Sequence, residues 1–231
     1  MLTFSDDILK MYANTKPAYK KVYNILKAEI LSGQTASMDR LTEVGVAQAL
    51  GISRTPVRAA LSQLKSEGIL DSVSKNGVGV KQLSRSDKAG LLYMDEVLES
   101  TAAYLAATNG SQEDIDTLFE INDTIRHFHY ESVKNNTELK GVRDLHLQFH
   151  LMIAKMSGNR FLYKEVVELR SLMLMHSNDD YARPSVYVDT ITPCHDKLLE
   201  ALNARDPEGA KLWMKVDLNL LKNIYSDSKI Q

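Results

Sequence analysis

The sequence contains a single cysteine, Cys194, and no apolar run that approaches the length of a membrane span. One cysteine cannot form an internal disulfide, which is typical of proteins in a reducing compartment. A transmembrane helix needs about 20 consecutive apolar residues, and the N-terminal segment MLTFSDDILK has acids where a secretion signal has an apolar core. Internal repeats and low-complexity tracts are also absent. We therefore expect a soluble cytoplasmic protein with no membrane partner.

The formal net charge is only −2, but the charges are unevenly distributed. Residues 1–83 hold 11 Lys and Arg against 7 Asp and Glu, whereas the remaining residues hold 17 against 23. A basic segment joined to an acidic body indicates that the first part meets a polyanion. A length of 231 residues favours two domains, and the change in pattern places them at residues 1–83 and 84–231.

Three short helices and a hairpin are predicted in the first part. Apolar residues at helical spacing occur between Tyr19 and Gly33, from Thr42 to Leu50, and from Thr55-Pro56 to Gly68. The following run ILDSVSKNGVGVKQL reads as two short strands joined at Asn76-Gly77. This order is typical of a winged helix-turn-helix preceded by an N-terminal extension.

The start of the third helix and the tip of the hairpin are the predicted DNA-reading elements. Backbone N–H groups at a helix start are free to meet phosphate, and Arg54 can make a bidentate contact to guanine in the major groove. Arg58 lies four residues later on the same face. The predicted DNA-binding residues are Ser53, Arg54, Thr55, Arg58, Lys75, Asn76 and Gly77.

The second part is predicted to be an antiparallel all-helical bundle, so that the chain is mainly α. Strand signals are absent there, and further helices fit residues 138–157, 160–178, 188–203 and 206–226. The two preceding helices have apolar stripes, one through Leu91, Met94, Leu98, Ala102 and Leu105 and the other through Leu118, Ile121, Ile125 and Phe128.

Three histidines and one aspartate fall on apolar helix faces in this second part. His146 and His150 are four residues apart on one face, and His195 and Asp217 lie on the apolar stripes of two later helices. A buried aspartate is costly unless a cation or a donor meets it, so the set suggests a transition-metal site. Ordinary core histidines and a capping aspartate are the alternative. His127 and His129, near charged residues, are expected to be solvated.

The run RLTEVGVAQALGISRTPVRAALSQLKSEGIL resembles the GntR family of bacterial regulators, and the similarity extends over residues 17–83. The resemblance implies a homodimer that binds an inverted-repeat operator in double-stranded DNA. Ala59 stands where the family usually has Glu, and Val44 stands where some members have Arg. The base preference of relatives therefore does not transfer to this chain.

Residues 84–226 resemble the FadR-like (FCD) ligand-binding domain through His146-Leu-Gln-Phe-His150, Ser157-Gly158-Asn159 and the segment around His195. The resemblance implies a metal held by one Asp and three His. In the family the first ligand is normally Asp and the last is His, whereas this chain has His146 and Asp217. The exchange preserves the donor set, and imidazole-rich ligation favours Zn²⁺ or Ni²⁺.

The resemblance also implies a small-molecule effector that modulates operator affinity, with an organic acid as the expected class. Many relatives carry R-x-x-L-E in the first bundle helix, but this chain has Asp95-Glu-Val-Leu-Glu99, which weakens the expectation of a carboxylate. Arg170 and His176 are the candidate effector-binding residues. We expect a repressor and not an enzyme. The alternatives are a constitutive repressor with a structural metal and a metal-dependent hydrolase, although no HExxH motif accompanies the histidines.

Overall fold

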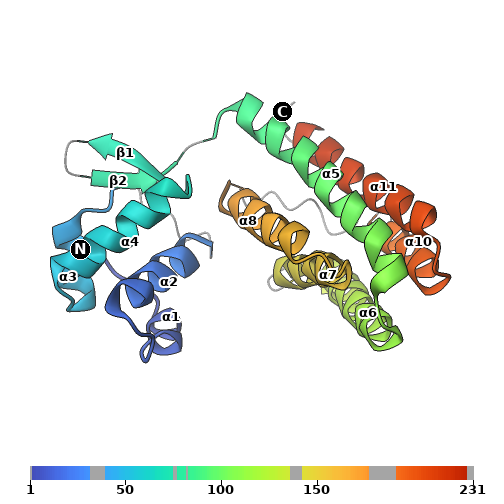
Figure 1. Cartoon of the computed structure of the whole chain (residues 1–231), viewed down its shortest axis with the longest axis horizontal. Coiled ribbons are helices and arrows are strands. Elements are labelled where there is room, and N and C mark those ends of the chain that lie inside the picture. The colour runs from blue at the N-terminus through green and yellow to red at the C-terminus, as the bar shows by residue number, and fades with distance from the viewer. Residues whose placement is uncertain are drawn as a thin grey trace. The chain divides into compact units, whose positions relative to one another are not determined.

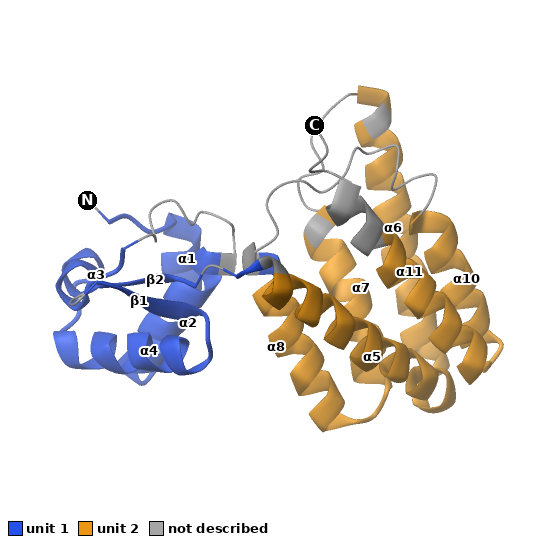
Figure 2. Cartoon of the chain, turned by 90° about the horizontal axis from the view of Figure 1, so that it is seen from above, with its two compact units in different colours: residues 1–84, 174–176 blue, residues 85–173, 177–231 orange. Residues whose placement is uncertain are grey.

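The computed structural model describes residues 2–31, 40–74, 77–81, 83–135, 142–176 and 191–227. Lys75 and Asn76 of the predicted wing lie outside these ranges, and so does the side chain of His176. The chain divides into two compact units, residues 1–84 with 174–176 and residues 85–173 with 177–231 (Figure 2). None of the described helices has the length and apolar character that a membrane span requires.

The first unit is a winged helix-turn-helix, as the sequence predicts (Figure 1). Its strands pair antiparallel, and Leu41 forms a bridge with Val78 that adds a third segment to the sheet. The elements are α1 (Asp6–Met11), α2 (Ala18–Leu31), α3 (Glu43–Leu50), α4 (Arg54–Ser66), β1 (Leu70–Ser74) and β2 (Gly77–Val80).

Local signals fix the helix-turn-helix. The Thr42 side chain accepts a hydrogen bond from the Gly45 N–H at 3.0 Å, which caps α3, and Gly51 ends this helix at a left-handed φ of 63°. The helix α4 begins at Arg54, with Ser53 in the N-cap position, so the predicted start at Thr55 was wrong by one residue. Apolar residues of α2 and α4 form the core as predicted, namely Val22, Ile25, Leu26, Ile30, Val57, Ala60, Leu61 and Leu64.

The hairpin differs from the prediction in the position of Gly77, which was expected to lie exposed at the tip of the wing. This residue pairs with Ser74 as the first residue of β2 and is buried. A Cβ atom at Gly77 would lie 2.9 Å from Ser74 Oγ and 3.1 Å from Arg40 Cγ. The glycine is therefore explained by close packing beneath the wing rather than by an open approach to DNA.

The second unit is a bundle of helices, as predicted. The helix α5 lies along α11, α7 packs against α5 and α6, and α10 packs against α6 and α11 (Figure 1). Leu162 and Val166 of α8 pack against Ala102 and Ala154. The helices are α5 (Arg85–Asn109), α6 (Gln112–Asn135), α7 (Val142–Met156), α8 (Arg160–His176), α10 (Thr192–Asn203) and α11 (Pro207–Asp227).

Two of the predicted apolar stripes are wrong in part, because polar residues occupy the buried face. On α5, Met94 is 51% exposed, while Asp95 and Glu99 are buried. On α6, Phe128 is 42% exposed, while His129 is fully buried. Apolar periodicity assigns the most hydrophobic face of a helix to the interior. In α5 and α6 part of the buried face is polar, so the buried face differs from the predicted one.

Candidate functional site

The N-terminus of α4 presents the predicted DNA-reading residues on the surface of the first unit. Ser53, Arg54, Thr55 and Arg58 are all exposed, whereas Val57 of the same turn is buried in the core. The first turn of α4 therefore offers free backbone N–H groups next to two guanidinium groups. Phosphate and guanine edges are the ligands that such a surface recognises.

Glu43 of α3 joins the two arginines, a contact that the sequence analysis missed. Its carboxylate accepts two hydrogen bonds from Arg58, at 2.7 and 2.9 Å, and one from Arg54 at 3.1 Å. The hydrogen bond from Arg58 is the main reason that the pKa of Glu43 falls to about 2. The arginine side chains remain 60% and 65% exposed, so Glu43 orients them without burying them.

Three histidines of the second unit meet inside the bundle. One ring nitrogen from each of His146, His150 and His195 lies within 4.8 Å of the other two, and all three residues are buried. His146 and His150 come from α7, and His195 comes from α10. Phe149 of α7 stacks on the His195 ring at a centroid distance of 4.2 Å. The i, i+4 spacing thus brings both imidazoles of α7 to one face, as expected.

Asp217 of α11 reaches two of these histidines. Its Oδ1 lies 3.4 Å from His195 Nε2, and its Oδ2 lies 3.5 Å from His150 Nε2. Among the described residues, neither carboxylate oxygen has a hydrogen-bond partner, and His195 Nε2 has none. A fully buried carboxylate facing two imidazole nitrogens without hydrogen bonds is a donor set that fits a divalent cation.

The outer nitrogens of two imidazoles are fixed by acceptors. His150 Nδ1 lies 2.6 Å from Glu99 Oε2, and His195 Nδ1 lies 3.0 Å from Asn122 Oδ1. A carboxylate oxygen and an amide oxygen can only accept, so each Nδ1–H donates. Arg170 Nη2, which also lies 3.0 Å from His150 Nδ1, is then a neighbour of that N–H and not its hydrogen-bond donor. The lone pair of each ring then resides on Nε2, which faces Asp217. Metal-binding histidines commonly have this arrangement.

A fourth imidazole joins the cluster from α6, contrary to the expectation that His129 is solvated. His129 is fully buried, and its Nε2 lies 3.2 Å from His146 Nε2. By contrast, His127 is exposed as expected. The signal for His129 was present in the sequence, because Leu118, Asn122, Ile125 and His129 form a stripe of helical spacing in which two members are polar.

Arg170 of α8 lies beside the histidine cluster and pairs with two buried acids of α5. Its Nε contacts Asp95 Oδ1 at 3.3 Å and also donates to Glu99, and its Nη2 lies 3.0 Å from His150 Nδ1. The predicted effector residue Arg170 is thus brought to the site.

Burial sets the charge states inside the bundle. Desolvation, followed by the charge of His195, lowers the pKa of His129 to about 4 and that of His146 well below its ordinary value. Desolvation would raise the pKa of Asp217, but His195 and His150 outweigh it, and the pKa is lowered. Neutral imidazoles, as these lowered pKa values give at His129 and His146, are the protonation state that metal ligation requires.

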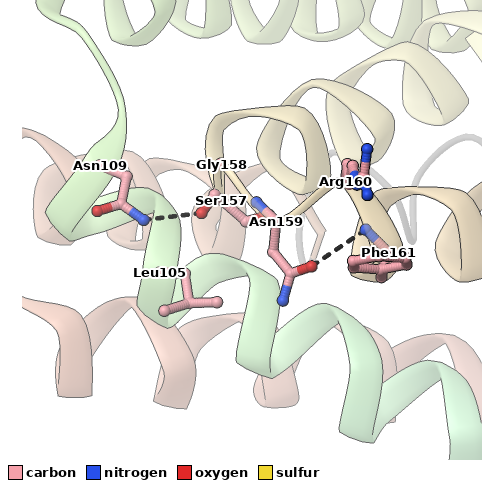
Figure 3. A pocket seen from close by; sticks show the side chains of 7 residues that line it. All are labelled: Leu105, Asn109, Ser157, Gly158, Asn159, Arg160 and Phe161. Carbon is pink, nitrogen blue, oxygen red and sulfur yellow. Dashed lines mark hydrogen bonds between the residues drawn. The ribbon is translucent and has the colours of Figure 1, made fainter.

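An open recess at the junction of α7 and α8, of about 500 Å³, is separate from this cluster (Figure 3). There Asn159 caps α8 by accepting from the N–H groups of Phe161 and Leu162 at 3.1 and 3.2 Å, and Gly158 has a φ of 69°. The Ser-Gly-Asn motif is therefore explained by a helix junction. The recess is lined by Leu105, Asn109, Ser157, Gly158, Asn159, Arg160 and Phe161.

The chain is similar to known regulators over most of its length. The family described as "Bacterial regulatory proteins, gntR family" matches residues 18–80, and the FCD domain matches residues 91–219. An uncharacterized HTH-type transcriptional regulator of Bacillus subtilis (strain 168), YdhC, is 26% identical, with 92% of this chain and 95% of the relative covered. A probable D-xylose utilization operon transcriptional repressor of Paenarthrobacter nicotinovorans is 26% identical, with 83% and 81% covered.

The fold is also similar to that of a solved structure, E. coli McbR/YncC. The two share 22% sequence identity with a TM-score of 0.76, and the match covers 93% of this chain and 100% of the other. At this identity the likeness establishes the fold alone.

Proposed function

Because the chain belongs to the gntR family of bacterial regulatory proteins and carries an FCD domain, we propose a regulator whose helical unit binds a divalent metal and an effector. The two families and the relatives identify the chain as a DNA-binding transcription regulator and not an enzyme. One relative is a repressor by its name, and we propose repression here too.

We propose that α4 reads the operator in the major groove. Arg54 has one Nη2 contact to Glu43 and is otherwise open to a base edge, whereas Arg58 is held by two hydrogen bonds to the same carboxylate. Arg54 is therefore the better base reader, and Arg58 the better phosphate contact. Ser53 and Thr55 would contact phosphate at the helix start. The wing residues Lys75 and Asn76 complete the proposed surface, whereas the buried Gly77 only shapes the turn between them and β2.

A homodimer on an inverted repeat is proposed for the intact regulator. An apolar patch on α5 supports it, because Tyr93, Met94 and Val97 are 68%, 51% and 47% exposed. Large exposed apolar side chains that are neighbours on one helix are typical of a surface that another chain covers.

The observation that carries the metal proposal is the pair of Nε2 atoms directed at Asp217. His146, His150, His195 and Asp217 would hold the ion, with Zn²⁺ or Ni²⁺ as the favoured metals. When bound, the ion would offer a Lewis-acidic position to an effector carboxylate. We propose Arg170, which lies beside the cluster, and His176 as the effector-binding residues.

Elemental analysis of untagged protein, purified without chelator, tests the metal site. We expect near-stoichiometric metal in the wild type and none in a His146→Ala/His150→Ala variant, with the exposed His127→Gln variant as the matched control. Operator affinity at fixed salt, with and without metal and with carboxylates added, then tests regulation. A wild type that takes up no metal after dialysis against Zn²⁺ or Ni²⁺ would refute the metal proposal. A metal that raises only the melting temperature would indicate a constitutive repressor.

A further inference from the structure

His129 is the buried imidazole that the proposed metal site does not use. It comes from α6, a helix that contributes none of the four proposed ligands, and it is fully buried beside His146. The two ring centroids are 5.5 Å apart with the planes tilted by 56°, so the rings do not stack. The contact is instead made edge to edge by two Nε2 atoms.

The two Nε2 atoms lie at hydrogen-bonding distance, which is also a spacing that two ligands of one ion can have. Adjacent nitrogens about 2.0–2.1 Å from one metal lie about 2.8–3.0 Å apart in an octahedral shell and about 3.3–3.4 Å apart in a tetrahedral shell. The Nε2 atoms of His129 and His146 are 3.2 Å apart. The other side of the cluster has similar spacings, since Asp217 oxygens lie 3.4 and 3.5 Å from His195 Nε2 and His150 Nε2.

The use of Nε2 is also common to the whole cluster. His150 and His195 donate through Nδ1 to Glu99 and Asn122, which leaves Nε2 as the inner nitrogen of each ring. His129 and His146 meet through Nε2 as well. Asn122 lies two turns before His129 on the same stripe of α6, so this helix already supports one histidine of the cluster and would supply another directly.

We propose that His129 is a direct ligand of the metal, so that four imidazoles and one carboxylate hold the ion; this inference rests on the metal site proposed above. With five protein donors, an ion that takes six ligands would have one position left for another ligand. That position would accept water or a single oxygen of an effector, and not a chelating pair. The nitrogen-rich shell also disfavours Mg²⁺ and Mn²⁺ relative to Zn²⁺ and Ni²⁺.

X-ray absorption at the zinc edge tests this directly on the full-length protein loaded with Zn²⁺. We expect scattering from four imidazoles in the wild type and in the His127→Gln control, and from three in His129→Gln. Chelator competition should show Zn²⁺ affinity at least about tenfold weaker in His129→Gln, as losses of supporting residues alone reach that size. Circular dichroism of the apo variants establishes that they fold.

Two substitutions separate a ligand from a hydrogen-bond partner. Glutamine at position 129 can still hydrogen-bond His146 but is a poor ligand, whereas His129→Glu places an anionic oxygen at similar reach. We expect His129→Glu to regain most of the Zn²⁺ affinity with three imidazoles and one added oxygen. Wild-type affinity and imidazole number in His129→Gln would overturn the inference and leave the four-ligand site intact. A wild type that binds no Zn²⁺ would overturn both.

Discussion

The two units differ in where the charged side chains of their candidate sites lie, which is at the surface in the first unit and in the interior in the second. In the first unit Arg54 and Arg58 stand on the surface above an apolar core, and Glu43 meets them there. In the second unit Asp217 and His195 are fully buried with a further set of polar side chains around them. The first unit presents charge at its surface, whereas the second encloses a cluster of polar side chains in its interior.

The same contrast predicts different consequences when a charge is removed. Exposed ion pairs contribute little to folding because water screens them, so changes at Arg54 or Arg58 should affect binding and leave stability unchanged. A buried charge that loses its partner is destabilising, because the remaining group stays desolvated. Changes inside the bundle should therefore affect stability and the site together.

The largest expected effect is the loss of folding stability when Arg170 is replaced, because this residue pairs with Asp95 and Glu99 in the interior. Arg170→Met leaves two buried carboxylates without their cation, and breaking such a network costs about 3–5 kcal/mol. Urea unfolding followed through the single tryptophan, Trp213 of α11, should show the loss. Arg126→Met is the control, since that arginine is 44% exposed in its ion pairs and should cost less than about 1 kcal/mol. Equal losses of unfolding free energy in the two variants would contradict the expected difference between buried and exposed ion pairs.

Metal binding should stabilise the helical unit by a slightly smaller amount. At free Zn²⁺ about 100-fold above the dissociation constant, a ligand that binds only the folded state contributes about 2.7 kcal/mol. We expect the melting temperature reported by Trp213 fluorescence to rise by about 5–10 °C. The His146→Ala/His150→Ala variant should show no rise. A rise in that variant would place the bound Zn²⁺ elsewhere.

The contrast also explains which features could be predicted from the sequence. In the first unit, apolar periodicity and a motif of fixed spacing indicate the same faces, so the core residues of α2 and α4 and the exposed Arg54 were predictable. In the second unit, the i, i+4 pair His146 and His150 was found because both fall on an otherwise apolar face.

The buried partners in the second unit were missed because each replaces an apolar residue. Asp95 and Glu99 occupy the face that periodicity assigns to Met94, and His129 occupies the place assigned to Phe128. Their burial depends on partners from other helices, such as Arg170 and His146, that no local pattern reveals. A stripe such as Leu118, Asn122, Ile125 and His129 shows what to look for, namely polar residues that continue an apolar stripe.

The DNA-reading surface should respond to Arg54→Ala in binding alone. A bidentate contact to guanine contributes about 1–3 kcal/mol of discrimination, so specific operator affinity at fixed salt should fall roughly 5- to 150-fold. Lys65→Ala, at the other end of α4, removes one positive charge as a control and should have a much smaller effect. Urea stability should be unchanged in both variants. An equal loss of affinity in the two would mean that α4 contributes only charge.

The smallest expected effect is that of Glu43→Gln, which tests whether the Glu43 carboxylate keeps Arg54 and Arg58 from binding phosphate. Removing the carboxylate frees Arg54 and Arg58 for phosphate, so affinity for non-operator DNA should rise about two- to fivefold, in proportion to the small strength of exposed ion pairs.

The pKa of Glu43 fixes the range in which this restraint operates. Because the folded pKa is lowered from 4.5 to about 2, the ion pairs are fully present above pH 4.5 and are lost only as the pH falls towards 2. The ratio of operator to non-operator affinity, measured by fluorescence anisotropy between pH 5 and 8, should therefore show no dependence on Glu43 ionisation. If Glu43→Gln instead weakened operator and non-operator binding alike, the carboxylate would hold the arginines in their binding geometry rather than compete with DNA for them.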